Sequence, residues 1–182
     1  MNKICVSGTT GSGKTTLARA LADRLELRMV DLDELHWGPD WTPRESFREE
    51  LDAITSGGGW VTSGNYSAVR ELTWARADTI VWLDYPARIV FWRLIRRTVR
   101  RVRTGEVLFG GNTETYRNTF FSRDSLLVWF FKTHWSKRRR YIEEFGERRR
   151  TGATLIHLRH PREAEAWLSS LPESTGNRSD LP

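Results

Sequence analysis

The stretch Gly8–Thr15, GTTGSGKT, constrains this chain more than any other, because it matches the phosphate-binding pattern G-x-x-x-x-G-K-[ST] at every fixed position. The apolar run of residues 2–7 precedes it, and a segment with leucine and alanine at helical spacing follows it. A strand, a glycine-rich turn and a helix are the context that the pattern requires. The turn then directs backbone N–H groups, and the positive end of the helix dipole, toward one phosphate group.

This pattern predicts a nucleoside triphosphate site, with ATP and Mg²⁺ as the expected ligands. We expect Lys14 to reach the β- and γ-phosphates and the Thr15 hydroxyl to ligate Mg²⁺. The predicted nucleotide-binding residues are Gly8, Thr9, Thr10, Gly11, Ser12, Gly13, Lys14, Thr15 and Thr16.

Carboxylates follow two of the predicted strands, where a phosphoryl-transfer enzyme needs one to hold the metal ion. Asp84 ends the apolar run of residues 80–84, and Asp31 and Asp33 follow the strand before them. An aspartate at the end of a strand is also a common helix cap. We assign Asp84 to the magnesium site, and Asp33 to the phosphoryl acceptor, as base or as a ligand in the magnesium shell.

Apolar runs alternate with helical patterns along the chain, which favours an α/β fold with a mainly parallel sheet. The length of 182 residues fits one domain, which we place at residues 1–171, with a flexible tail at 172–182. Thr42 and Pro43, with Glu45 three residues after Thr42, predict a helix that starts at that point.

Positive charge gathers in one segment of the chain. Residues 86–150 hold 17 Lys/Arg against 6 Asp/Glu, a local net charge of +11 in a chain whose net charge is +6. Arg93, Arg96, Arg97, Arg100 and Arg101 recur at helical spacing, so a long helix from about residue 86 to 103 carries one cationic stripe.

Three interpretations of this segment stay open. In a lid, its arginines close over the γ-phosphate, with Arg97, Arg101 and Arg138 as the candidate catalytic cations. In a nucleic-acid surface, residues 86–150 neutralise backbone phosphates while nearby aromatic rings stack on bases. In the third interpretation the stripe is a solvated helix face.

The remaining composition excludes some classes of protein. The single cysteine, Cys5, offers neither a disulfide framework nor a zinc pattern. No apolar run approaches the roughly twenty residues of a membrane-spanning helix. We therefore expect a cytoplasmic enzyme that acts on a small-molecule acceptor, without membrane partners, as a monomer or homodimer.

The order of the motifs GTTGSGKT, DLDELHW, WVTSGNY, DTIVWLDYP and SRDSLLVW resembles a family of small P-loop proteins. These are the DNA-topology-modulation (FlaR-type) or adenylate-kinase-related proteins, whose wider relatives are nucleoside monophosphate, shikimate and gluconate kinases. The resemblance covers about residues 1–170.

The resemblance implies a three-layer P-loop kinase fold, with a five-stranded parallel sheet of order 2-3-1-4-5 and a helical lid at about residues 101–122. It also implies an ATP-dependent kinase that resembles nucleoside monophosphate kinases, or a nucleotide-dependent protein that binds nucleic acid. Residues on the acceptor side would be Asp33, Trp37 and Arg44, with Gly64, Asn65 and Tyr66 as the pocket floor.

Overall fold

The computed structural model describes residues 1–113, 135, 138–146, 148 and 152–172. The strands are β1 Lys3–Gly8, β2 Arg28–Asp31, β3 Trp60–Ser63, β4 Thr79–Leu83 and β5 Thr154–Leu158. The helices are α1 Lys14–Leu25, α2 Leu32–His36, α3 Phe47–Ser56, α4 Ser67–Arg76, α5 Ala87–Thr104 and α8 Pro161–Ser170, with short 3₁₀ turns η1 Pro39–Trp41 and η2 Phe109–Gly111. Residues 114–134, which include 114–122 of the predicted lid, lie outside the described residues, as do residues 173–182 of the predicted tail.

The five strands form one sheet in the order β2-β3-β1-β4-β5, and each pairing is parallel. The fold class and the strand order are therefore as predicted. In a parallel sheet the carboxyl ends of all strands meet at one edge, and ligands bind there, where the strand order reverses. That reversal lies beside β1, which runs directly into the glycine-rich turn.

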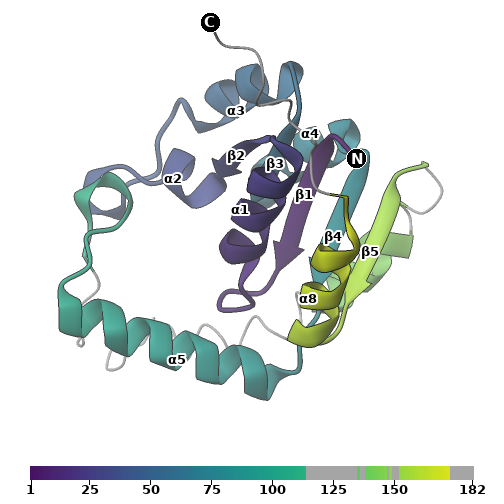
Figure 1. Ribbon diagram of the computed structural model, residues 1–182. Coiled ribbons are helices and arrows are strands. Elements are labelled where there is room, and N and C mark those ends of the chain that lie inside the picture. The colour runs from purple at the N-terminus through teal and green to yellow at the C-terminus, as the bar shows by residue number, and fades with distance from the viewer. Residues whose placement is uncertain (114–134, 136–137, 147, 149–151, 173–182) are drawn as a thin grey trace, which may run out of the picture.

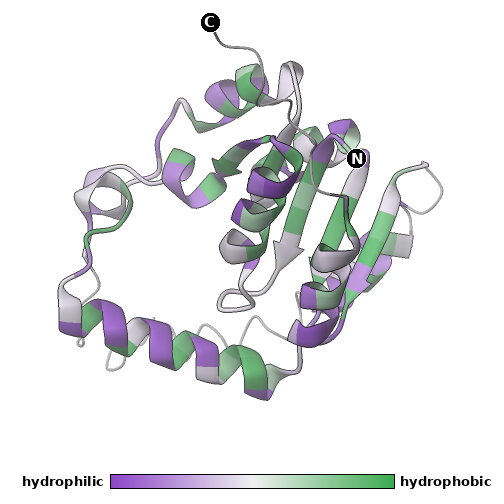
Figure 2. Ribbon diagram, viewed as in Figure 1, coloured by the Kyte–Doolittle hydropathy of each residue, from purple (hydrophilic) through white to green (hydrophobic). Residues whose placement is uncertain are grey.

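Helices cover both faces of the sheet (Figure 1). On one face α1, α5 and α8 pack over Ile4 and Val6 of β1, and on the other α3 and α4 pack over Cys5 and Trp82. Alternate residues of a strand point to opposite faces, so β1 and β4 carry apolar residues on both faces, and much of the sheet is green or white in Figure 2. Residues 138–146 add Tyr141 and Phe145 to the second core.

The helix predicted to begin at Thr42 begins instead at Phe47. Pro43 forms a bridge with Trp37, and the backbone N–H of Arg44 donates to His36 O at 2.8 Å. These contacts hold residues 37–44 as a loop around the 3₁₀ turn η1. The sequence analysis also missed α4, which follows the GNY stretch.

Candidate active site

The glycine-rich turn joins β1 to α1 and leaves the start of α1 open to a phosphate group. Gly13 has a φ of 96°, a conformation that an L side chain rarely adopts, and it provides no side-chain cap. The first N–H groups of a helix lack partners within the helix, so they can donate to an anion. The Nζ atom of Lys14 donates to Thr9 O at 3.1 Å, which keeps this side chain folded over the turn.

Thr15 lies in the first turn of α1, at the centre of an oxygen cluster. Its hydroxyl donates to Asp31 Oδ2 at 3.2 Å and lies 3.1 Å from Ser63 Oγ. Asp31 and Ser63 end two adjacent strands and face each other in the sheet register. Burial raises the pKa of Asp31, and the negative charge of Asp33 raises it further. A nearby cation would relieve both effects, and hydroxyl and carboxylate oxygens are the ligands that Mg²⁺ prefers.

Asp84 is the residue that the sequence predicts for the magnesium site, but its side chain does not belong to the Thr15, Asp31 and Ser63 cluster. Its carboxylate accepts from Nε and Nη2 of Arg138 at 2.8 and 3.1 Å, and from His157 at 3.0 Å. Its side chain is 5% exposed, and it does not line the cavity beside the glycine-rich turn. Asp84 follows β4, on the side of β1 opposite to β2 and β3. The carboxylate that contacts Thr15 is therefore that of Asp31, and we move the proposed magnesium role to it.

Asp33 lies in the first turn of α2 and is held by an aromatic neighbour. The Tyr66 hydroxyl donates to Asp33 Oδ1 at 2.6 Å. Burial and the charge of Asp33 raise the pKa of Tyr66, so this phenol keeps its proton and remains a donor. His36 packs against Tyr66 at 4.3 Å between ring centroids, and burial lowers the pKa of His36. A neutral aromatic support therefore fixes one carboxylate oxygen of Asp33.

Asn65 connects the acceptor side to the glycine-rich turn. Its Nδ2 donates to Gly8 O, and its Oδ1 accepts from Gly8 N at 3.4 Å and from the Tyr141 hydroxyl at 2.5 Å. Tyr141 is 3% exposed and stacks on Trp74. Asn65 thus ties the first glycine of the turn to the buried core on the far face of the sheet.

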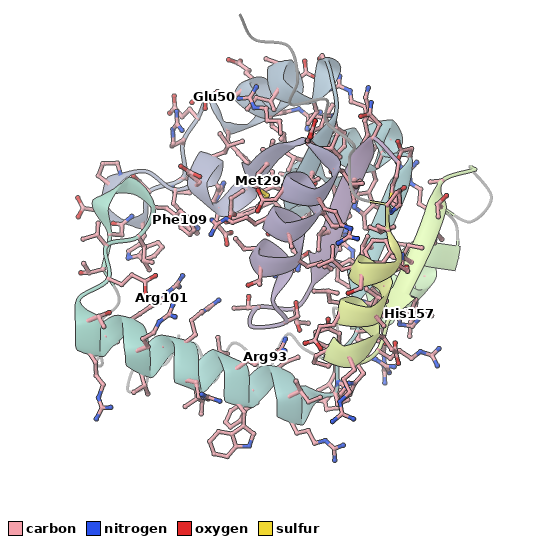
Figure 3. The ribbon with its side chains drawn as sticks, in the orientation of Figure 1. Met29, Glu50, Arg93, Arg101, Phe109 and His157 are labelled. Carbon is pink, nitrogen blue, oxygen red and sulfur yellow. The ribbon has the colours of Figure 1, made fainter. Side chains whose placement is uncertain are left out.

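The arginine stripe of α5 lines a cavity of about 1820 Å³ together with the glycine-rich turn. Figure 3 shows Arg93 and Arg101 on the same side of α5, the side toward the rest of the domain. Arg93 donates to Ser12 O at 3.2 Å, which brings α5 onto the turn. The residues of the stripe in the cavity wall are Arg93, Arg96, Arg97, Arg100 and Arg101.

Arg97 and Arg101 thus lie where the predicted catalytic cations should, but Arg138 does not. Arg138 forms a two-pronged ion pair with Asp84, and this hydrogen-bonded pairing raises the pKa of Arg138. It does not line the cavity in the part of the chain that the structure describes. Its role here is to bind residues 138–146 to the end of β4.

Most of the predicted acceptor residues line the same cavity, namely Asp33, Trp37, Gly64, Asn65 and Tyr66. Arg44 does not, because its guanidinium pairs with Glu50 at 2.5 Å. Sequence reasoning missed other lining or supporting residues: Trp41, Ser63, Glu106, Phe109 and Asn112. A signal existed for some of these, since the WGPDW and LFGGN stretches both place an aromatic side chain beside a turn-forming glycine.

Comparisons with known proteins point to small-molecule kinases. No family model matches the chain. A shikimate kinase from Persephonella marina is 30% identical over 115 residues, which cover 51% of this chain and 67% of the relative. The solved shikimate kinase from Bacteroides thetaiotaomicron has a TM-score of 0.52 and 19% identity, over 91% of this chain and 93% of that one. For a gluconokinase from Sinorhizobium meliloti 1021 the TM-score is 0.52 and the identity 21%, over 92% and 91% of the two chains.

These relatives agree with the kinase part of the resemblance that the motifs suggested, and the DNA-topology part stays a prediction. The two solved structures show that the fold is shared. Among the helices that the structure describes, none combines the length and the apolar character needed to cross a membrane.

Proposed function

This chain belongs to the shikimate kinase-like family of small P-loop kinases, and we propose that it transfers the γ-phosphoryl group of ATP to a hydroxyl group of a small acceptor with the help of Mg²⁺. The observation that supports this most is the composition of one cavity wall. It combines the glycine-rich turn, the Asp31 and Asp33 carboxylates and the α5 arginines.

Each group has a part in the transfer. The backbone N–H groups at the start of α1 and the Lys14 ammonium bind the triphosphate. Thr15 and Asp31 would hold Mg²⁺, which neutralises phosphate charge when it is bound. Asp33, with one oxygen held by Tyr66, accepts the proton of the acceptor hydroxyl. Arg97 and Arg101 stabilise the negative charge that spreads over the transferred phosphoryl oxygens.

The test is product formation by the purified chain with ATP, Mg²⁺ and a panel of polyols, hydroxy acids, nucleosides and nucleoside monophosphates. We expect one acceptor class to gain a phosphoryl group, detected by mass spectrometry. Lys14→Ala should lower the rate roughly 100-fold or more, because one charge-stabilising group is lost. Arg28→Ala is the matched control, since Arg28 is exposed at the amino end of β2. An unchanged rate in Lys14→Ala would falsify the proposal.

The second candidate, nucleotide-dependent binding of nucleic acid, is favoured by the local charge of +11 in residues 86–150. The stripe of α5 lines the cavity, so this function has to rest on other arginines. Arg88 and Arg103 of α5, and Arg139, are exposed and do not line the cavity.

A further inference from the structure

Three aromatic side chains line the part of the cavity farthest along α5 from the glycine-rich turn. Trp37 follows α2, Trp41 ends η1 and Phe109 begins η2. The rings of Trp37 and Trp41 meet edge to face at 5.8 Å between centroids. Trp41 is 38% exposed, and Figure 3 shows Phe109 in the turn beyond the end of α5, near Arg101. Exposed aromatic rings in a cavity wall are typical of a ligand site.

Asn112 fastens the two turns that carry these rings. Its side chain is almost fully buried, and its Nδ2 donates to Gly38 O at 2.8 Å and to Phe109 O at 2.6 Å. Its Oδ1 accepts from the backbone N–H of Trp41 at 3.1 Å. Gly110 fits against Gly38 so closely that a Cβ atom there would lie 2.3 Å from Gly38 O. We call these contacts between η1 and η2 the clasp.

The backbone beneath the exposed ring is strained. Asp40 and Trp41 have φ values of 54° and 56°, in the left-handed region that bulky side chains rarely adopt. Strain of this kind persists only where surrounding contacts impose it, and it gathers at ligand clamps and active sites. Here the clasp imposes it, and the result is a tryptophan held in the cavity wall instead of in the core.

The charge of this wall limits the acceptors that it fits. Asp33, Glu34 and Glu106 all line the cavity. The nearest arginine in the segment after α2, Arg44, is paired with Glu50. Arg101, the last arginine of the stripe, lies 3.4 Å from Glu106. An uncharged ring would meet aromatic faces here, with the carboxylates as hydrogen-bond acceptors, while the α5 arginines of the same wall serve the triphosphate.

We propose that the acceptor is an uncharged alcohol with a planar ring, of the nucleoside type, bound against Trp37, Trp41 and Phe109 with its hydroxyl at Asp33. This rests on the proposed kinase function and narrows its substrate class. It separates this chain from a kinase that phosphorylates a polyhydroxy acid. The ring stacks on the aromatic wall, while the hydroxyl attacks the γ-phosphorus and gives its proton to the Asp33 carboxylate as ADP leaves.

The experiment compares acceptors at saturating ATP and Mg²⁺. The probes are four ribonucleosides and two uncharged aryl alcohols, set against shikimate and gluconate, and each reaction is followed by ADP release and by product mass. We expect kcat/KM to be at least about 10-fold higher for one of the ring-bearing probes than for either acid. Phosphorylation of shikimate or gluconate with no ring-bearing product overturns the inference and leaves the kinase function standing. Absence of a product with every probe and with the wider acceptor panel overturns both.

Variants of the wall test the site itself. Trp41→Ala or Phe109→Ala should raise KM for the ring-bearing probe about 10-fold, the loss of one stacking contact, and leave kcat within about 2-fold. Trp41→Phe keeps an aromatic face and should restore most of the affinity, which separates stacking from a folding defect. The control is Trp92→Ala, because Trp92 is 63% exposed on α5 and does not line the cavity. An unchanged KM in Trp41→Ala and Phe109→Ala contradicts the proposal.

Discussion

At the scale of single residues, Asp31 shows a conflict between stability and activity. Its pKa is raised above that of an ordinary aspartate, so the folded chain binds this proton more tightly than the unfolded chain does. The resulting stability is present at low pH and is lost as the pH rises through the raised pKa. We expect Asp31→Asn to stabilise the ligand-free protein by about 1 kcal/mol at pH 7, because Asn still accepts the cap hydrogen bond from Asp33 N. Urea unfolding at pH 7 measures the gain, which should vanish below about pH 4.

The same substitution should impair catalysis. An Asn side chain is uncharged and attracts a divalent cation less than a carboxylate does. We therefore expect Asp31→Asn to lower activity about 10- to 100-fold and to raise the Mg²⁺ concentration that gives the half-maximal rate. Asp84→Asn is the comparison, since Asp84 pairs with Arg138 and His157. If Asp84→Asn, and not Asp31→Asn, shifted the Mg²⁺ dependence, the sequence-based assignment of the metal would be correct and ours wrong.

From the sequence, the residues of the candidate site could be named, but the hydrogen-bond partner of each could not. The Gly8–Thr15 motif names its ligands because backbone geometry and a fixed spacing define the site. The choice between Asp31 and Asp84 depends on which carboxylate contacts Thr15, and neither residue's own neighbours in the chain reveal that. The hydrogen bond from Tyr141 to Asn65 joins residues 76 positions apart, which a local pattern cannot predict.

At the scale of elements, residues 138–146 support the glycine-rich turn through Tyr141 and Asn65. Tyr141→Phe removes one buried hydrogen bond to Asn65 Oδ1. We expect a loss of about 1 kcal/mol in the free energy of unfolding, since Asn65 Oδ1 loses the closer of its two donors. ATP affinity, measured by calorimetry, should fall because Asn65 also holds both backbone groups of Gly8. Thr55→Val is the control, because Thr55 is also buried and hydrogen-bonded, to Leu51 O, but does not line the cavity. Equal ATP affinity in both variants would argue against this support.

The clasp is a second device at this scale, because it joins the turn after α2 to the turn after α5. Asn112→Ala removes three hydrogen bonds and leaves the N–H of Trp41 without its side-chain partner. We expect about 1–3 kcal/mol lower stability. We also expect a higher rate of ATP hydrolysis relative to acceptor phosphorylation, since a looser wall admits water. Asn2→Ala, outside the cavity wall, is the comparison. An unchanged ratio of hydrolysis to transfer in Asn112→Ala would show that the clasp does not exclude water.

The strand order within the sheet followed from the resemblance to small P-loop kinases. The succession of strands along the chain was predictable from the residues, because β1 and β4 read as short apolar runs that are almost entirely buried. The start of α3 was not. Thr42, Pro43 and Glu45 have the composition of a helix start, but the contacts of residues 37–44 with α2 and η2 override that local preference. Residues 109–112 illustrate the same limit, since their partner is a segment more than 70 positions earlier.

At the scale of the whole molecule, two sets of arginines stand out among the described residues of 86–150. The α5 stripe faces the cavity, and Arg88, Arg103 and Arg139 face solvent. If the charge serves nucleotide chemistry, neutralising the stripe should abolish phosphoryl transfer, and neutralising the solvent-facing set should not. We expect Arg97→Ala with Arg101→Ala to lower kcat at least about 1000-fold, because cations at the transferred phosphoryl group act in the transition state. The triple change of Arg88, Arg103 and Arg139 to Ala should leave kcat within about 2-fold.

The same pair of variants tests the nucleic-acid alternative. Binding of single- and double-stranded DNA, measured by fluorescence anisotropy at about 50 and 200 mM salt, should be weak and equal in all variants if the charge belongs to the enzyme site. A nucleic-acid function predicts the reverse: affinity that falls steeply with salt, with a slope that decreases by about one for each phosphate contact removed. If the triple variant lost this salt dependence and kept phosphoryl transfer, Arg88, Arg103 and Arg139 would belong to a DNA-binding surface that is separate from the cavity.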